Sequence, residues 1–264
     1  DATFKSYFNL YFKNQKIHKE TIKQGKIIEK KAFLKSRFVF FSSKWALNSA
    51  INSYPKLKNK FKIIKYGSNF SFEPHKKKIL KSISIKRNSL SHLNFISVGV
   101  DWNRKGMTKA LKLIDYLNSK GVKSKLTIVG SKPKNSSLII KKTKIIEFLD
   151  KNILEQERQL SKLYLTSHFN LFFTKAEAYG ISLVEACAHG IPSIANNIGG
   201  VTSIIKENIN GKSFNINTPI NLIGNYIINL TRKKNHYNKL CSGAYYDYCK
   251  NLSWKCSSKK INHF

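Results

Sequence analysis

The sequence predicts an α/β fold with a doubly wound parallel sheet. Short apolar runs of strand length recur along the chain, and segments with apolar residues at helical spacing separate them. Strands that alternate with helices favour a parallel sheet with helices on both faces, because each parallel strand needs a crossover to return the chain. One strand–loop–helix–strand–loop unit, residues 169–200, carries the glutamates and glycines of a candidate site.

The composition is that of a folded protein. Its 264 residues suffice for one large domain or two small ones, and 41% hydrophobic residues predict a buried core. No apolar run approaches the roughly 18 residues that cross a bilayer, and no signal peptide is evident. The four cysteines lack C-x-x-C or zinc-type spacing, which predicts free thiols in a reducing compartment. We therefore expect a cytoplasmic protein, either free or at the inner face of the membrane.

The formal charge of +34 has more than one explanation. Lysine, asparagine, isoleucine and serine, whose common codons are A/T-rich, are heavily used, so a coding bias accounts for much of the lysine without any function. The functional alternative is attraction to an anionic substrate or a membrane surface. Nucleic acid ranks last, because the lysines are spread along the chain and no nucleic-acid motif occurs.

The N-terminal quarter predicts two helices and then a strand–helix–strand unit. Asp1–Lys35 is polar with helical periodicity, and we expect two helices broken near Asn14–His18. Basic helices of this kind pack on a sheet or lie on a membrane. Arg37–Phe41 and Phe61–Ile64 read as strands, and Ser42-Ser43 supplies a cap for the helix between them.

From residue 72 onward strands and helices alternate. Gly121 and Gly190 stop two of the predicted helices, as glycine commonly does. The predicted order is a helix within Phe72–Lys86, strand Leu93–Gly99, helix Met107–Lys120, strand Lys125–Val129, a polar loop with a short helix, strand Ile145–Leu149, helix Glu155–Ser167, strand Phe169–Phe173, a helix from near Gly180 to Ala188, strand Ser193–Ala195, a helix at Thr202–Ile205, a tight turn at Asn210-Gly211, helix Pro219–Leu230 and a helical tail, Asn235–Phe264.

The loop after strand Phe169–Phe173 offers an anion site between two carboxylates. The helix that begins near Gly180 presents unpaired N–H groups and a partial positive charge, and glycine lets the backbone approach a ligand closely. Glu177 precedes this helix on the edge where open α/β sheets bind ligands, and Glu185 lies eight residues on. Two carboxylates beside a phosphate site make sense if one receives hydroxyls from a ribose and the other from a hexose.

Two cations follow strand Leu93–Gly99. Arg104 and Lys105 fall on the same edge as Glu177, where they could neutralise a departing diphosphate. His168 and His189 have the chemistry of a base, but we interpret them as structural; His189 lies near a helix C-terminus, where a cation is favoured.

The stretch E-A-Y-G-I-S-L-V-E-A, with Glu177 and Glu185 in an E-x7-E spacing, is followed by Gly-Ile-Pro and Gly-Gly. Together these residues resemble the donor-binding motif of the GT4 family of retaining glycosyltransferases. The resemblance implies a GT-B fold, in which two Rossmann-like domains face each other. The strand, Ser-Lys-Trp-Ala helix, strand and Gly-x-Asn order of the first 70 residues resembles the end of the N-terminal domain and the hinge of that family.

The resemblance also implies a division of the chain. Residues 1–70 would be the remnant of a truncated, acceptor-side domain, and 71–240 the nucleotide-sugar-binding domain. Residues 241–264 would be a helical tail that packs back on the first part. Since the chain starts with Asp rather than Met, we expect it to be the C-terminal part of a longer protein and to be inactive alone.

Roles for individual residues follow from the same resemblance. Glu177 would hold hydroxyls of the transferred sugar, and Glu185 the ribose. In the family an arginine follows the glycine of the first strand, but here Val100 follows Gly99, so either Arg104 supplies that cation or the site is weaker. The diphosphate would be held by Arg104, Lys105 and the backbone of Tyr179, Gly180 and Ile181, with further donor contacts from Ser182, Gly199, Gly200, Thr202 and Leu149.

The implied reaction moves a hexosyl group from a nucleotide-diphosphate sugar to a hydroxyl of a glycan or lipid-linked acceptor, with retained anomeric configuration. No cofactor or metal is expected, because the cations and the helix dipole would replace a metal and no D-x-D motif occurs. Peripheral membrane contact through the basic surface is a further expectation. The alternatives are a nucleotide-sugar epimerase on the same fold, a non-catalytic nucleotide-binding or membrane-bound scaffold, and, last, a nucleic-acid binder.

Overall fold

The computed structural model describes residues 2–12, 18–133 and 142–264, and its largest element is a six-stranded sheet. Every strand pair in this sheet is parallel, which confirms the predicted fold class. The order β5-β4-β3-β6-β7-β8 means that the chain runs out from β3 to one edge, returns to the centre and runs to the other edge. The strands are β3 His92–Val98, β4 Lys123–Val129, β5 Thr143–Ile146, β6 Phe169–Phe172, β7 Ser193–Asn196 and β8 Gly211–Phe214.

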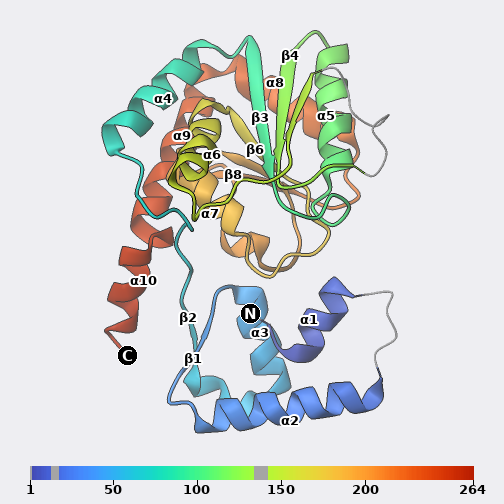
Figure 1. The fold of residues 1–264 in the computed structure, drawn as a ribbon, viewed down its shortest axis with the longest axis vertical. Helices are drawn as coiled ribbons and strands as arrows, with labels where there is room; N and C mark the ends of the chain where they lie inside the picture. Colours follow the sequence, from blue (N-terminus) through green and yellow to red (C-terminus); the bar gives the residue numbers. More distant parts are fainter. Residues whose placement is uncertain (1, 13–17, 134–141) are drawn as a thin grey trace.

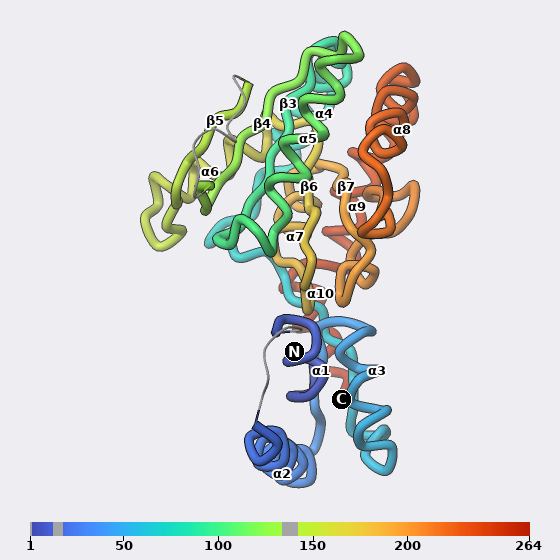
Figure 2. The backbone as a smooth tube through the Cα atoms, turned by 90° about the vertical axis from the view of Figure 1, so that its right-hand side faces the viewer, coloured from blue at the N-terminus to red at the C-terminus, as the bar shows by residue number. Residues whose placement is uncertain are grey.

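Helices cover both faces of the sheet (Figures 1 and 2). Parallel crossovers are right-handed, so the crossover helices α5 and α7, which follow strands running outward in opposite directions, lie on opposite faces. α5 packs against α8, and α7 packs against α9. The helices of this part are α4 Lys76–Asn88, α5 Met107–Ser119, α6 Leu154–Thr166, α7 Ile181–Ala188, α8 Ile220–Arg232 and α9 Lys234–Asp247.

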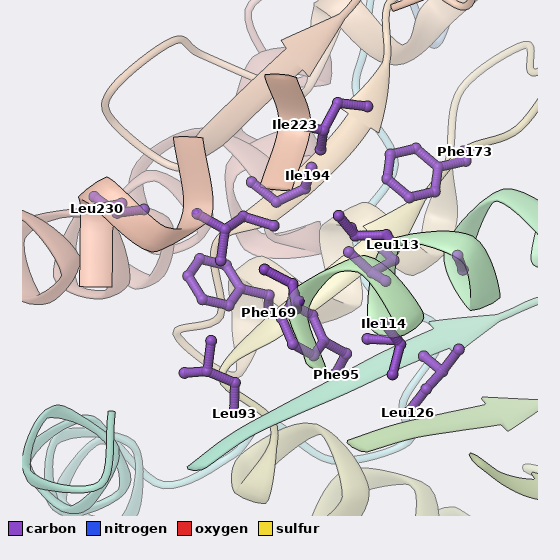
Figure 3. Close-up of a cluster of buried hydrophobic side chains, with 14 of the residues drawn as sticks. Leu93, Phe95, Leu113, Ile114, Leu126, Phe169, Phe173, Ile194, Ile223 and Leu230 are labelled. Carbon is purple, nitrogen blue, oxygen red and sulfur yellow. The ribbon is translucent and has the colours of Figure 1, made fainter. Parts of the chain in front are cut away.

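The main hydrophobic core lies between the sheet, α5 and α8 (Figure 3). Phe95 of β3 and Phe169 of β6 stack with their ring centres 5.6 Å apart, and α5 adds Leu113 and Ile114 to the same cluster. Apolar residues recur along α5 at helical spacing, so one stripe of the helix faces the sheet. Burial of each large apolar side chain contributes about 1.5–3 kcal/mol.

The N-terminal part forms a smaller unit at the lower end of Figure 1. Its two-stranded parallel sheet has an aromatic core, in which the Phe33 ring meets the rings of Phe41, Tyr54 and Phe61 at centroid distances of 5.3 to 6.1 Å. The elements are α1 Phe4–Tyr11, α2 Lys19–Lys35, β1 Val39–Phe41, α3 Lys44–Ser53, the 3-10 helix η1 Pro55–Lys60 and β2 Phe61–Ile63.

The last helices return to this smaller unit. A π-helical turn, η4 Tyr248–Leu252, leads from α9 to α10, Trp254–Ile261. The Trp254 indole donates a hydrogen bond to the Ser68 carbonyl at 2.9 Å, and the Phe264 ring lies 5.6 Å from that of Phe38. α9 is continuous through residue 241, where the resemblance places the start of a tail.

Three predicted elements differ from the structure. The tight turn predicted at Asn210-Gly211 is shifted: the turn covers residues 208–210, with Asn208 left-handed at φ +60°, and Gly211 already starts β8. β8 escaped prediction because its sequence, GKSF, lacks an apolar run. The helix expected at residues 202–205 is a 3-10 turn, η3 Gly199–Ser203. The predicted strand Ile145–Leu149 is shifted to β5, which leaves Leu149 in the following loop.

Two other expectations fall on residues that are not described. The break near Asn14–His18 lies almost wholly outside the described residues, and the short helix expected before β5 falls in a segment of which 134–141 are not described. Within the described ranges, no helix is both long and apolar enough to cross a membrane.

Candidate functional site

The candidate site lies at the carboxyl ends of β3 and β6, the neighbouring strands at which the strand order reverses. Open α/β sheets form ligand crevices at such a switch point. The loops after these strands touch, because the Lys175 amide donates to the Arg104 carbonyl at 2.7 Å. Gly106 lies at this contact with φ +70°, and a Cβ there would be 2.1 Å from the Phe173 carbonyl oxygen. The close approach of the two loops therefore requires glycine at position 106.

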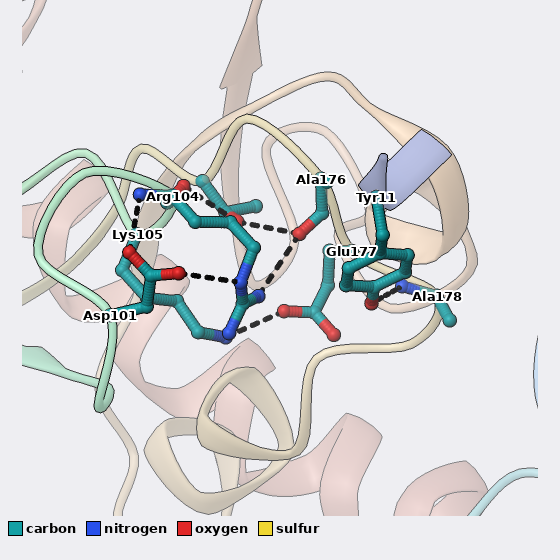
Figure 4. A network of polar contacts seen from close by, with 8 residues as sticks. Tyr11, Asp101, Arg104, Lys105, Ala176, Glu177 and Ala178 are labelled. Atoms are coloured by element: carbon teal, nitrogen blue, oxygen red, sulfur yellow. Dashed lines mark hydrogen bonds and ion pairs between the residues drawn. The ribbon is translucent and has the colours of Figure 1, made fainter. Parts of the chain in front are cut away.

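Lys105 and Glu177 form a shielded ion pair (Figure 4). Lys105 Nζ lies 2.7 Å from Glu177 Oε2, and the two side chains are only 14% and 12% exposed. The ammonium also lies 5.0 Å from the Phe172 ring centre. The lysine stem runs over Gly99, where a Cβ would be 2.6 Å from Lys105 Cγ. The structure thus brings two of the predicted site residues together, in surroundings where charges interact more strongly than on an open surface.

Arg104 lies beside this pair and meets the N-terminal helix. Its Nη1 donates to the Ala176 carbonyl at 3.3 Å, and its guanidinium lies 5.5 Å from the centre of the Tyr11 ring. The Tyr11 hydroxyl accepts a hydrogen bond from the Ala178 amide at 2.9 Å. Burial raises the pKa of Tyr11 to about 12, so the hydroxyl is protonated at neutral pH. Sequence reasoning missed Tyr11, because no motif connects α1 to this loop.

α7 begins at the site. Gly180 is its N-cap, with φ +105°, and no side chain of the described residues caps the helix. Its first-turn amides are therefore suited to an anionic ligand. Tyr179 is buried and donates from its hydroxyl to the Tyr66 carbonyl at 2.7 Å, while Ile181 and Ser182 are half-buried in the first turn.

Gly199 and Gly200 pack against the loop that carries Glu177. The Gly200 amide donates to the Glu177 carbonyl at 2.9 Å. A Cβ at Gly199 would lie 2.1 Å from the Glu177 carbonyl oxygen, and one at Gly200 would lie 1.9 Å from that of Ala178. Glycine at both positions thus permits the close packing of η3 on this loop. Thr202, in the same turn, is exposed.

Glu185 lies deeper than Glu177 and already has protein partners. Its side chain is 3% exposed, Lys151 Nζ lies 2.5 Å from its Oε1, and the Tyr164 hydroxyl donates to its Oε2 at 3.1 Å. A buried carboxylate needs such partners, because transfer from water is costly without them. Sequence reasoning missed both partners. A ribose at Glu185 would have to share these oxygens with Lys151 or displace it.

A cavity of about 630 Å³ opens beside Lys151. Gly99 and Val100 line it at the end of β3, and Leu149 lines it after β5. Neither Glu177 nor Glu185 is among the residues that line this cavity; Glu185 is joined to it through Lys151, and Lys105 packs on Gly99. The wall is completed by residues that include Ser68, Phe70, Gly130, Phe148, Asn152 and Trp254.

His168 and His189 are buried, neutral residues. His189 Nδ1 donates to the Glu185 carbonyl at 2.7 Å, and its Nε2 accepts from Ser161 Oγ at 2.9 Å. Burial lowers the pKa of both imidazoles to about 4. The cation that helix position favours at His189 is therefore not formed at pH 7, because burial outweighs the dipole. Among the described residues, no group of three or more His, Cys, Asp or Glu could hold a metal ion.

These features define a parallel α/β domain with a charged candidate site at the switch point of its sheet. Residues 81–245, more than half of the chain, match the model of the family described as glycosyl transferases group 1, and the chain belongs to this family.

Individual proteins are similar to this chain in part of their sequence or in fold. Sucrose synthase 2 of Pisum sativum is 27% identical over 88 residues, which are 32% of this chain and 11% of that protein. HepE of Anabaena, in complex with UDP and glucose, has a TM-score of 0.67 at 16% identity, over 91% of this chain and 66% of its own. WaaG, a glycosyltransferase involved in lipopolysaccharide biosynthesis, has a TM-score of 0.70 at 15% identity, over 100% of this chain and 72% of its own. The chain thus has a GT-B type of fold and spans about two thirds of the length of HepE.

Proposed function

We propose that this protein transfers a hexosyl group from a nucleotide-diphosphate sugar to an acceptor hydroxyl with retention of the anomeric configuration, as GT4 enzymes do. The observation that carries this proposal is the shielded Lys105–Glu177 pair beside the start of α7. A cation and helix amides suit a diphosphate, and an adjacent carboxylate suits the hydroxyls of the sugar joined to it. Membership of the glycosyl transferase family and the UDP bound in HepE support the same reading.

We assign to Lys105 the role of binding the diphosphate as it leaves the sugar. An ammonium has three protons; one is directed at Glu177 Oε2, which leaves two for phosphate oxygens. Arg104 takes a supporting role, because its guanidinium is held by the Ala176 carbonyl and the Tyr11 ring. Negative charge grows on the diphosphate as the sugar departs, so a fixed cation stabilises the transition state more than the bound substrate. In this proposal no metal ion is required.

Glu177 would accept hydroxyls of the transferred sugar, and Glu185 hydroxyls of the ribose. A carboxylate offers about four acceptor positions, so Glu177 can bind a hydroxyl while it keeps Lys105. Val100, 65% exposed in the cavity wall, occupies the place of the family's arginine. This difference is the observation that favours a second candidate function, a non-catalytic nucleotide-binding scaffold.

The acceptor side and the membrane are further parts of the proposal. We assign a glycan or lipid-linked acceptor and peripheral contact with an anionic membrane surface. α2 supports this contact, because Ile28 and Leu34 are 67% and 51% exposed on a helix rich in lysine.

Donor binding is the first test. We expect UDP-, GDP- or ADP-glucose to raise the melting temperature, since a ligand that binds only the folded state stabilises it by about 2.7 kcal/mol at 100 times its Kd. Lys105→Gln should reduce this gain only in part, because Lys105 contacts the diphosphate of the bound donor but stabilises the transition state more. Lys132→Gln is the control, because Lys132 pairs with Glu147 on the open surface, at 2.9 Å. Stabilisation by none of the three donors would overturn the proposal.

Product chemistry separates the candidates. With a donor that binds, proton NMR should show that the first-formed sugar product keeps the anomeric configuration of the donor. An epimerised nucleotide sugar formed from donor alone would instead favour the epimerase. Binding without any turnover by the full-length protein would favour the scaffold.

A further inference from the structure

Lys151 connects a buried carboxylate to the wall of the 630 Å³ cavity. Its side chain is 30% exposed and lines the cavity, whereas its partner Glu185 is 3% exposed. Lys151 Nζ lies 2.5 Å from Glu185 Oε1 and 5.6 Å from the centre of the Phe70 ring, which lines the same cavity. The lysine is therefore the member of this pair that a ligand in the cavity meets first.

Glu185 can release Lys151 only if another donor replaces it. A buried carboxylate without partners is costly, and the Tyr164 hydroxyl supplies one donor at 3.1 Å. Two hydroxyls of a ribose would supply further donors to the same carboxylate. If the Lys151 ammonium leaves Glu185, it needs another anion as a partner. A nucleotide carries a phosphate close to its ribose, which can be that partner.

The backbone around Lys151 is held, so the lysine side chain alone can make this change. The Asp150 amide donates to Gln156 Oε1 at 2.7 Å, and the Asn152 amide donates to Asp150 Oδ1 at 2.9 Å. A lysine stem has several rotatable bonds and can redirect its ammonium by several ångströms while the loop stays in place.

We infer that Lys151 is a phosphate-binding cation that pairs with Glu185 until a nucleotide enters, and then transfers to a phosphate oxygen as the ribose hydroxyls take over Glu185. This inference rests on the proposed function. Lys151 and Gly99 both line the cavity, and Lys105, although it does not line the cavity itself, packs on Gly99, so a second lysine lies next to the cavity wall. Lys151 also brings positive charge to a wall that carries the uncharged Val100. The exchange couples the contact between the ribose and Glu185 to the contact between Lys151 and a phosphate, so Lys151 contributes to the affinity of a nucleotide and little to that of the nucleoside.

Lys151→Gln is the test variant, because an amide can still donate to Glu185 but carries no charge. By calorimetry, we compare whichever of UDP, GDP and ADP binds the wild-type protein with its own nucleoside. Diphosphate affinity should fall about 10- to 100-fold, the range of a charged hydrogen bond, and nucleoside affinity less than about threefold. Lys151→Arg should restore most of the diphosphate affinity, and the surface control Lys132→Gln should change neither.

The other possible results would overturn either this inference alone or the proposed function as well. Equal losses for diphosphate and nucleoside, or no loss for either, would overturn the inference and leave Lys151 as a structural partner of Glu185. Absence of binding by all three diphosphates to the wild-type protein would overturn the proposed function, and this inference with it. If the glutamine variant melts far below the wild type, Lys151→Met, which fills similar space, replaces it. The loss of diphosphate affinity is then compared with the loss of nucleoside affinity in the same way.

Discussion

Replacing Lys86 with methionine should stabilise this protein at neutral pH. Lys86 lies on α4 with 2% of its surface exposed, and its ammonium has no hydrogen-bond partner within the described residues. Methionine fills a similar volume without charge, so Lys86→Met removes a desolvated cation and keeps the packing.

The size of the effect follows from the pKa of this lysine. Burial lowers the pKa of Lys86 from 10.5 to about 8, and nearby Cys241 has a smaller effect in the opposite direction. At about 1.4 kcal/mol per pKa unit, holding the charged lysine in the folded protein costs about 3 kcal/mol at pH 7. We expect Lys86→Met to recover about 2–3 kcal/mol, or about 5–10 °C in melting temperature.

The pH dependence gives a second and independent check. The folded chain holds this proton less tightly than the unfolded chain, so the full cost applies below pH 8. The free energy of unfolding of the wild type should therefore rise relative to that of the variant as the pH increases from about 8 to 10.5. The advantage of Lys86→Met should therefore be largest at pH 7 and mostly gone by pH 10.5.

Urea unfolding followed by circular dichroism at both pH values measures this difference. Lys81→Met is the matched control, because Lys81 is exposed on the same helix and should change stability by less than about 0.5 kcal/mol. The reasoning would be refuted if Lys86→Met were no more stable than the wild type at pH 7, or if its advantage were the same at both pH values.

Three further predictions concern the site. Gly106→Ala should lower the free energy of unfolding by more than about 2 kcal/mol, because φ is +70° and the new Cβ meets the Phe173 carbonyl; urea unfolding that shows a loss below 1 kcal/mol would contradict this. Tyr11→Phe should lower stability by about 0.5–1.5 kcal/mol through the lost hydrogen bond from the Ala178 amide, and Tyr11→Ala, which also removes the ring from Arg104, by more; equal losses in thermal scans would count against a role for the ring. Lys105→Ala should lower kcat more than it raises the KM of the donor, and steady-state kinetics with equal changes in both would argue against the leaving-group role.

The order of most elements and the proximity of Lys105 and Glu177 in the candidate site could be predicted from the sequence. Apolar periodicity and helix stop signals are local properties, and they placed β3, β6 and α7 within a residue or two. Lys105 and Glu177 could be placed on one edge because each follows a parallel strand, and the ends of parallel strands share an edge. β8 could not be predicted, since a short polar strand at a sheet edge has no pattern of its own.

The partners of the site residues could not be predicted in this way. Tyr11 and Ala178 are 167 positions apart, and Lys151 and Glu185 are 34 apart. Nothing in the local sequence distinguishes Lys86, which is buried, from Lys81 on the same helix, which is exposed. These differences arise when α4 packs on α6 and α9 and when α1 meets the loop after β6.

The sequence by itself therefore determined the α/β class, the parallel sheet and the edge at which the charged residues gather, because these depend on patterns within a few residues. Only the tertiary structure decided which charges are shielded, which are paired and which line the cavity. Burial and pairing depend on neighbours brought from distant parts of the chain, and they determine how strongly each charged side chain at the site interacts with other charges.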